Sequence, residues 1–176
     1  MSYFLPGNIH FLYPSTIFAS KEECFITTIL GSCVAVCFWD PMIKAGAMNH
    51  YMLPLWNGQG LASPKYGNIA IKKTFEKMVQ LGSNIENIKA KVFGGGEVLN
   101  SLNSQFNIGD RNIEIARIML DELGIPIVSS STGGKKGRKI LFSTATGEVK
   151  HKLINPPDPS DILNNLPPTA NLYNKL

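Results

Sequence analysis

One cysteine and one histidine stand in this 176-residue chain where their side chains could act together. Cys33 follows Gly31-Ser32, a flexible turn whose backbone N–H groups could bind an oxygen atom, and His50 comes seventeen positions later. A thiol, a base and an oxyanion-binding turn are the parts of a centre for nucleophilic acyl transfer. The alternative is that both side chains are ordinary core residues, because a free cysteine is often simply buried.

The segments beside these residues have the pattern of a β-hairpin. Val34–Trp39 is β-branched and aromatic, Ala45–Tyr51 is a second short run, and a loop of about five residues with an Asp-Pro turn signal joins them. If the end of the first strand lies opposite the start of the second, Cys33 faces Tyr51, and a shift of one residue places it opposite His50. Opposed residues have Cβ atoms about 4.5–5.5 Å apart. The hairpin therefore predicts that thiol and imidazole come within reach.

Length and composition indicate one globular domain with a real core. The chain has the size of a typical single domain, and 44% of its residues are hydrophobic. No apolar run approaches the ~18 residues of a membrane span, so no membrane insertion is predicted. The N-terminus lacks a basic region followed by an apolar one, so no signal peptide is predicted either. We expect a cytoplasmic protein.

The three cysteines, Cys24, Cys33 and Cys37, argue against a disulfide framework because their number is odd. The spacing of Cys33 and Cys37 suggests a metal pair, but no second cluster of Cys or His completes a four-ligand site. The other histidines, His10 and His151, are isolated. We therefore expect no metal and no cofactor.

The formal net charge of +4 is compatible with nucleic-acid binding, but the basic residues are scattered apart from the short run Lys135–Lys139. No aromatic platform or recognised nucleic-acid module accompanies that run, so no nucleic-acid partner is expected. Mild basicity instead favours docking on an acidic protein surface. Within the run, Lys135, Lys136 and Arg138 are expected to steer such a partner toward the site.

The remaining pattern predicts an α+β fold, a mixed α/β layered sandwich in one strand-rich domain with two main helices. Apolar spacing predicts a helix from Gly67 to Gly82 and another from an Asp110 N-cap to Leu123. The other predicted strands are Thr16–Ala19, Cys24–Leu30, Lys89–Phe93, a buried strand at Ile125–Val128, and the hairpin of Lys139–Ser143 with Glu148–Leu153. Residues 1–154 are expected to form the domain, and the Pro- and Asn-rich residues 155–176 a largely extended tail.

Two connections near the predicted sheet ends are candidates for the rim of the site. Gly94-Gly95-Gly96 is not a P-loop, since no Gly-Lys-Ser/Thr follows. Its ordinary interpretation is a tight strand-to-helix turn, and its functional one is close approach of a substrate backbone. The loop Asn57–Lys65 follows His50 closely. Gly94 and Gly95 thus join Gly31 and Ser32 as candidates for the oxyanion site or its rim.

Several short blocks of the sequence are together far more specific than any one of them. They are Leu30–Cys37, Asp40-Pro41, Gly46–His50, Met52–Pro54, Lys91–Gly95, Ile108–Asn112, Gly133-Gly134 and Gly137–Lys139. In this order they resemble the CheD family of chemoreceptor glutamine deamidases, over nearly the whole chain except its tail. The resemblance implies a protein-glutamine deamidase with an α/β sandwich fold related to that of bacterial toxin deamidases.

The resemblance also implies roles for three residues. The cysteine of Gly-Ser-Cys is the nucleophile, the histidine seventeen residues on is its base, and a threonine six residues before the cysteine completes the site. These positions are Cys33, His50 and Thr27, with Thr28 next to the third. His50 would hold Cys33 as a thiolate and then protonate the departing ammonia. Thr27 would accept a hydrogen bond from the other imidazole nitrogen, although an ordinary strand threonine is an equal alternative.

The family acts on glutamines in the long helical cytoplasmic domains of methyl-accepting chemoreceptors. Some members also hydrolyse receptor methyl esters, and some bind CheC, a phosphatase of phosphorylated CheY. The main alternative is a non-enzymatic adaptor for receptors or a CheC-type phosphatase, against which the intact Cys33 and His50 argue. A papain-like protease would carry local signatures that are absent here. A thiol redox protein would need a resolving cysteine, and Cys37 lies about 13 Å along the strand.

Overall fold

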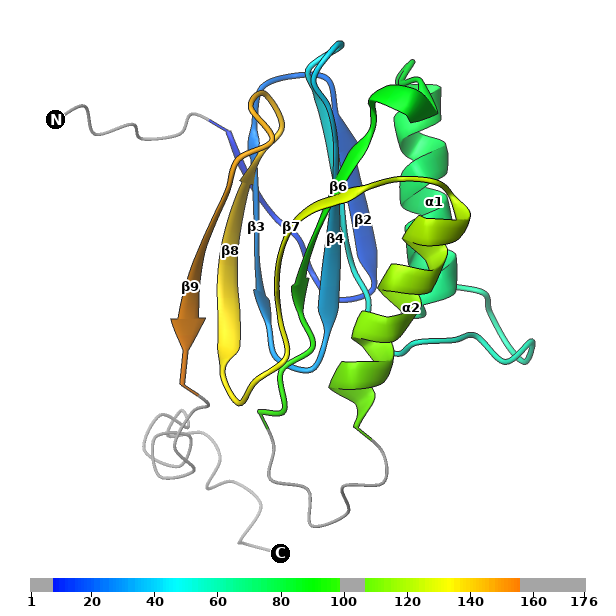
Figure 1. Ribbon diagram of the computed structural model, residues 1–176, viewed down its shortest axis with the longest axis vertical. Helices are drawn as coiled ribbons and strands as arrows, with labels where there is room; N and C mark the ends of the chain where they lie inside the picture. Colours follow the sequence, from blue (N-terminus) through cyan, green and yellow to red (C-terminus); the bar gives the residue numbers. More distant parts are fainter. Residues whose placement is uncertain (1–7, 99–106, 156–176) are drawn as a thin grey trace, which may run out of the picture.

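Two β-sheets lie face to face, and two helices cover the outer face of one of them, in the computed structural model, which describes residues 8–98 and 107–155 (Figure 1). The strands are β1 (Ile9–Phe11), β2 (Thr16–Ser20), β3 (Phe25–Leu30), β4 (Val34–Asp40), β5 (Ala45–His50), β6 (Lys89–Gly94), β7 (Ile127–Thr132), β8 (Gly137–Ser143) and β9 (Val149–Ile154). The helices are α1 (Gly67–Gln80), the 3-10 helix η1 (Ile85–Asn87) and α2 (Ile108–Glu122). The predicted α+β layered sandwich is confirmed.

β4 is the central strand of the five-stranded sheet, whose order is β2-β5-β4-β6-β7. Its residues Val36 and Phe38 pack in the core beneath the helices, whereas Ala35 and Cys37 pack in the core between the two sheets. Alternate residues of one strand thus enter two different cores. Burial on both faces explains why this segment reads as an almost continuous apolar run.

Both helices turn an apolar face toward the five-stranded sheet. α1 contributes Ile71 and Met78 to the core beneath the helices, and α2 contributes Ala116 and Leu120. Their charged residues lie on the solvent-facing side, as expected of amphipathic helices on a sheet, whereas the polar Thr74 of α1 and Asn112 of α2 are buried.

The helix ends show one agreement with the sequence prediction and one correction. Gly82 follows α1 with a φ of 99°, a left-handed conformation that favours glycine and ends the helix as predicted. α2 begins before the predicted N-cap, because the side chain of Asn107 accepts a hydrogen bond from the Asp110 N–H. Asp110 is instead an acidic residue of the first turn, where its charge complements the helix dipole.

β7 lies at an edge and is not the buried strand that was predicted at Ile125–Val128. It pairs in parallel with β6 alone, and its other edge has no strand beside it within the described sheet. Ile125 is buried, but Ile127 and Val128 are exposed. The strand also continues to Thr132, beyond the predicted end at Val128, because β6 supplies backbone partners along that length.

The four-stranded sheet has the order β1-β3-β8-β9 and packs its inner face on the second core. Ile26 and Leu30 of β3 meet Ile140 and Phe142 of β8 in that core. The antiparallel pairing of β8 with β9 confirms the hairpin predicted near the C-terminal end. This sheet places β3 opposite β5, which positions the candidate site between the two sheets.

The predicted tail, residues 155–176, lies outside the described residues apart from Asn155, so its boundary stays a prediction. In the part of the chain that the structure describes, no helix has the length and apolar character needed to span a membrane.

Candidate active site

Cys33 lies in the short turn between β3 and β4, against the glycine turn that follows β6. The Gly95 N–H donates to the Cys33 carbonyl, and the Gly96 N–H donates to the Gly31 carbonyl, each at 2.8 Å. Gly94 has a φ of 108°, and a Cβ there would overlap the Cys33 carbonyl oxygen. Only glycine permits this approach. The predicted rim residues Gly94 and Gly95 are thus brought to the backbone of Cys33, and their part in a reaction stays a prediction.

The hairpin of β4 and β5 differs by one residue from the predicted register. Asp40, and not Trp39, pairs with Ala45. The reason is that β4 continues through Asp40, which leaves a connecting loop one residue shorter than predicted.

Cys33 and His50 flank the last rung of this hairpin. In that rung Val34 and Tyr51 exchange both backbone hydrogen bonds, at 3.1 and 3.0 Å. Continued by one residue, the register makes His50 a diagonal neighbour of Cys33 on the face toward the four-stranded sheet. Diagonal neighbours in an antiparallel pair lie about 7–8 Å apart, with their Cβ atoms somewhat closer. The two residues therefore share a face, at a diagonal step rather than directly opposite.

Asn49 occupies an irregular position in the hairpin just before His50. Regular pairing of β4 with β5 ends at Cys37 and Met48. Beyond that point the Val36 N–H donates to the Asn49 side-chain oxygen, and the Asn49 amide donates to the Thr74 hydroxyl of α1, each at 3.0 Å. The side chain thus satisfies a β4 donor and fastens this part of β5 to the helix layer.

His50 is held by a hydrogen-bonded relay that starts outside its own sheet. The Thr28 hydroxyl oxygen lies 2.8 Å from His50 Nδ1 and 2.7 Å from the Leu12 carbonyl oxygen. A carbonyl only accepts, so Thr28 donates its single proton to Leu12 and accepts from Nδ1–H. The imidazole then presents Nε2 as its basic nitrogen. This Nε2 is buried and has no hydrogen-bond partner among the described residues.

Thr27 points the other way, which corrects the predicted contact with the imidazole. Its hydroxyl donates to the Ile140 carbonyl of β8 at 2.8 Å. Neighbouring residues of a strand face opposite sides of the sheet, and in β3 it is Thr28 that faces β5. The threonine that supports His50 in the structure is therefore Thr28.

Burial sets the charge state of the pair. It raises the pKa of the Cys33 thiol, an effect that the backbone N–H of Cys33 itself partly opposes. It lowers the pKa of His50 to about 4, an effect that the nearby Leu12 carbonyl partly opposes. At neutral pH the resting pair is a neutral thiol and a neutral imidazole, and not the preformed thiolate that the sequence suggested. The thiol must lose its proton as it reacts.

The two other cysteines lie in the core between the sheets. Cys24 and Cys37 are both buried, and burial raises the pKa of the Cys37 thiol far above its usual range. Neither is placed to react with a solvent-borne substrate. Within residues 8–98 and 107–155, no group of three or more His, Cys, Asp or Glu side chains is placed to hold a metal ion.

Asn112 is a site residue to which the sequence analysis gave no role. From α2, its side-chain amide donates to the carbonyls of Ser32 and Met52, on either side of the reactive pair. The signal available in the sequence was its place in the Ile108–Asn112 block. The contact itself depends on how α2 packs, which no local pattern reveals.

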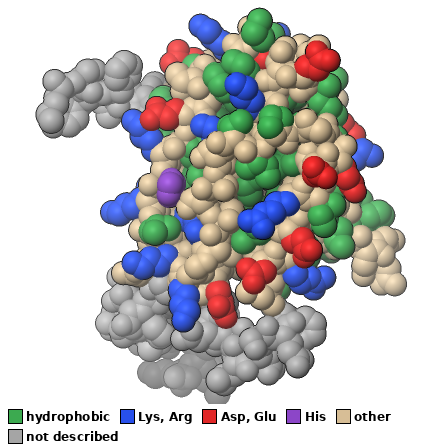
Figure 2. Space-filling model, in the orientation of Figure 1, with side chains coloured by type: hydrophobic (Ala, Val, Ile, Leu, Met, Phe, Trp, Pro, Cys, Tyr) green, Lys and Arg blue, Asp and Glu red, His purple; other side chains and the backbone are tan. Residues whose placement is uncertain are grey.

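Arg138 does not belong with the surface lysines with which the sequence grouped it. It is only 5% exposed, and its guanidinium donates to the Ser131 hydroxyl and to the carbonyls of Gly133 and Lys136. These bonds tie the turn between β7 and β8, and burial lowers the pKa of the guanidinium. Lys135 and Lys136 remain exposed. On the face shown in Figure 2, basic and acidic side chains are interspersed.

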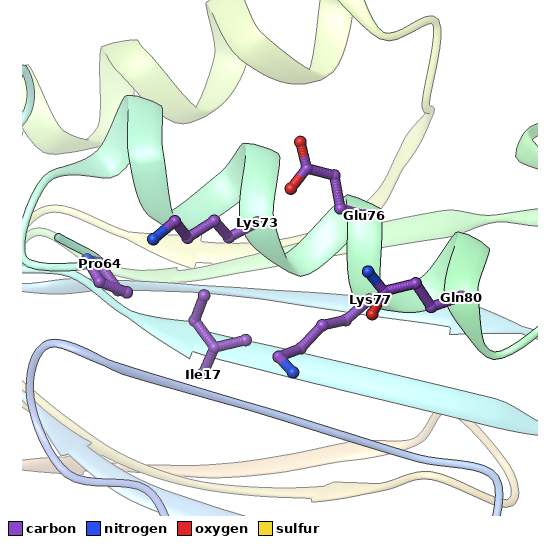
Figure 3. A pocket seen from close by; sticks show the side chains of 6 residues that line it. All are labelled: Ile17, Pro64, Lys73, Glu76, Lys77 and Gln80. Carbon is purple, nitrogen blue, oxygen red and sulfur yellow. The ribbon is translucent and has the colours of Figure 1, made fainter. Parts of the chain in front are cut away.

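The loop at residues 57–65 leaves the sheet close to His50 and returns to it. The Lys65 carbonyl accepts the N–H groups of Met52 and Leu53 at 2.9 and 3.1 Å, which fastens the base of the loop. Pro64 lines an open groove of about 370 Å³ between α1 and β2 (Figure 3). The other lining residues are Ile17, Lys73, Glu76, Lys77 and Gln80. Among the described residues, none of these side chains is hydrogen-bonded to Cys33 or His50, and a rim role for the loop stays a prediction.

Comparison with known proteins gives a consistent result. The family model described as "CheD chemotactic sensory transduction" matches residues 52–153. A protein of Trichlorobacter lovleyi named "Probable chemoreceptor glutamine deamidase CheD" is 50% identical over 144 residues, which cover 82% of this chain and 89% of that protein. A protein of the same name from Sulfurimonas denitrificans is 45% identical over 146 residues, covering 82% and 93% of the two chains.

An aligned stretch of 144 residues within a chain of 176 necessarily includes both Cys33 and His50. Among solved structures, Neisseria meningitidis protein NMB0706 aligns with a TM-score of 0.48 and 10% identity, covering 72% of this chain and 64% of that one.

Proposed function

The chain belongs to the CheD family, and from this premise we propose that it is a chemoreceptor glutamine deamidase. It hydrolyses the side-chain amide of specific receptor glutamines to glutamate and ammonia. The observation that carries the catalytic assignment is the relay from Leu12 through Thr28 to His50, which leaves Nε2 bare on the face that Cys33 shares. Cys33 is the nucleophile and His50 is the general base.

The first half of the reaction forms a thioester. As Cys33 Sγ bonds to the amide carbon, its proton passes to His50 Nε2 and the carbonyl oxygen becomes an oxyanion. Backbone N–H groups of Ser32 and Cys33 are the proposed donors to that oxygen. The imidazolium then gives its proton to the amide nitrogen, the C–N bond breaks, and ammonia leaves.

The second half restores the enzyme. Water attacks the thioester carbon while His50 Nε2 takes one of its protons, and the C–S bond then breaks. The proton returns from His50 to the sulfur, and the carboxylic acid that is released loses its remaining proton to solvent to become a glutamate side chain. Thr28 supports both halves, because an imidazolium donates from Nδ1 to the Thr28 hydroxyl, which already donates to Leu12.

The resting charges suit this sequence of steps. With its pKa near 4, His50 is unprotonated at neutral pH and able to accept the thiol proton. Burial raises the pKa of the Cys33 thiol, so the thiol stays protonated in the resting enzyme. It gives its proton to His50 only when the substrate amide has displaced solvent and the sulfur attacks. The pair therefore becomes charged only along the reaction path, where the relay stabilises the imidazolium.

We place the reaction in the cytoplasm, on the helical cytoplasmic domains of methyl-accepting chemoreceptors. A CheC-type phosphatase is the second partner that we propose. Both proposals rest on the family, and the names of the two relatives specify only chemoreceptor glutamine as the target.

The test is deamidation of a receptor cytoplasmic fragment co-produced with the protein. Mass spectrometry of the fragment detects each glutamine whose NH₂ has been replaced by OH. We expect conversion with the wild type and none with Cys33→Ala, whereas Cys37→Ala, which removes a buried thiol from the same strand region, keeps most activity. A folded Cys33→Ala protein that still converts the fragment would refute the proposed nucleophile.

A further inference from the structure

The amide of Asn112 joins the two halves of the site. The residue lies near the N-terminus of α2 and is completely buried. Its Nδ2 donates to the Ser32 carbonyl at 3.0 Å and to the Met52 carbonyl at 2.9 Å. Ser32 directly precedes the nucleophile, and Met52 follows the base by two residues. One side chain thus uses both amide hydrogens to hold the two segments at a fixed spacing.

These two segments are not held by strand pairing at that point. The last rung of the hairpin is the pair Val34 and Tyr51. Beyond this pair, toward Ser32 and Met52, no further backbone pairing joins the two segments among the described residues. The Asn112 amide lies between them there and bonds to both carbonyls, so it takes the place of the next rung.

Further contacts fix the amide itself. The Tyr51 hydroxyl donates to the Asn112 backbone carbonyl, which closes a ring through the last rung of the hairpin. Gly109 approaches Gly95 so closely that a Cβ on Gly109 would overlap the Gly95 carbonyl oxygen. The N-terminal end of α2 is thus seated on the same glycine turn that holds the backbone of Cys33.

The side-chain oxygen of Asn112 shows which part of the amide matters at this position. Oδ1 of Asn112 is buried and has no hydrogen-bond partner among the residues that the structure describes. The orientation is fixed, because both neighbouring carbonyls can only accept and therefore require Nδ2. A buried acceptor without a partner costs stability. The contribution of this side chain therefore lies in its two donors.

We propose that Asn112 is a positioning residue of the deamidase, which sets the spacing between the Cys33 sulfur and the His50 imidazole without touching either. The proposal rests on the proposed function. Because Cys33 and His50 are diagonal neighbours, their separation depends on the segments that Asn112 bridges. A misplacement of the reacting groups by about 1 Å is enough to cost on the order of 100-fold in rate.

The first experiment compares Asn112→Ala with Leu120→Ala in the full chain. Leu120 is fully buried on the same helix, and its truncation is expected to destabilise the protein at least as much. At a temperature where circular dichroism shows both folded, we expect kcat for the receptor fragment to fall roughly 10- to 100-fold for Asn112→Ala, with KM within about twofold. Leu120→Ala keeps kcat. Equal losses of kcat in the two variants would overturn the proposal.

The second experiment is a double-mutant cycle that needs no receptor. Alkylation of Cys33 by iodoacetamide is timed in the wild type, His50→Ala, Asn112→Ala and the double variant. If Asn112 acts through the spacing of the pair, the double variant is no slower than His50→Ala, whereas independent effects multiply. Asn112→Ser keeps one hydroxyl donor in place of the two amide hydrogens, so we expect its Cys33 alkylation rate to lie between those of the wild type and Asn112→Ala. It replaces Asn112→Ala in the cycle if the alanine variant does not fold.

The outcomes separate the two proposals. If the wild type releases no ammonia from the receptor but the cycle is non-additive, the function is wrong and the positioning role stands. If deamidation proceeds and the effects multiply, only the positioning role is overturned.

Discussion

At the scale of single residues, His50 sets the pH range in which the site works. Only the unprotonated imidazole accepts the thiol proton, and burial lowers the pKa of His50 from 6.5 to about 4. We predict that kcat/KM for deamidation stays on its plateau as the pH falls through 6.5 and decreases as it falls through about 4. A pH–rate profile on a fragment that stays folded measures this, and an acidic limb near 6.5 would contradict the buried environment.

The two adjacent threonines of β3 form a matched pair for a second prediction. Thr28→Val removes the hydroxyl that links His50 to Leu12, whereas Thr27→Val removes one that only bonds to Ile140. A lost hydrogen bond to a group that becomes charged is worth about 1.5–3 kcal/mol, so kcat should fall roughly 10- to 100-fold for Thr28→Val. Steady-state kinetics should show Thr27→Val close to the wild type. The reverse order would restore Thr27 as the supporting residue.

Residue types and spacing singled out Cys33 and His50 as candidates, because a thiol after a Gly-Ser turn and a histidine in the paired strand are visible in the sequence. They could not choose between Thr27 and Thr28. That choice depends on which face of β3 meets the other sheet, and a shift of one residue reverses it. Asn112 was out of reach for another reason, since its contact joins residues 80 positions apart through the packing of a helix.

At the scale of elements, the glycine turn after β6 is expected to control the backbone of the nucleophile. Gly94→Ala places a Cβ where the Cys33 carbonyl lies and also forces alanine to a φ of 108°. Gly60→Ala is the control, because Gly60 has a φ of 71° and no atom within 4 Å of its Cβ position. Each substitution costs roughly 1–2 kcal/mol of stability, because it places an alanine in left-handed backbone. Gly94→Ala is expected to lower the melting temperature more than Gly60→Ala does, and to remove most of the activity. Equal melting curves would show that the turn can move aside.

The elements themselves were largely predictable, but their pairing was not. Apolar runs and an Asp-Pro turn located the β4–β5 hairpin. Its register was missed because Asp40, read as part of the turn, is a fully buried strand residue. β7 was expected to be buried from the apolar character of Ile125–Val128. It lies at an edge because the order of strands in a sheet depends on contacts distant in sequence.

At the scale of the whole molecule, the predicted charge steering would rest on the exposed Lys135 and Lys136, without Arg138. Arg138 is buried in the turn that it stabilises, so it offers little charge to an approaching partner. We predict that the double variant Lys135→Ala/Lys136→Ala raises KM for a receptor fragment at low salt. The effect should vanish above physiological ionic strength, where charges are screened beyond about 8 Å. A salt series of KM values checks this, and no difference at low salt would remove the steering role.

The α+β class followed from counting strands and helices, whereas the division of the interior into two cores did not. β4 contributes to both cores through alternate residues, and a continuous apolar run does not reveal which residue enters which. The site lies at the junction of these layers, so its complete geometry is a property of the assembled sandwich.

The pairing of β3 also determines when the site can exist during protein synthesis. β3 carries Thr28, and one of its two neighbours is β8, whose contact with Thr27 spans 113 residues. The ribosome releases Cys33, Thr28 and His50 long before it releases β8 and α2. Because distant contacts must close before the sheet is complete, the nascent chain holds a thiol and an imidazole without the scaffold that orients them. Deamidation therefore becomes available only after nearly the whole domain has left the ribosome.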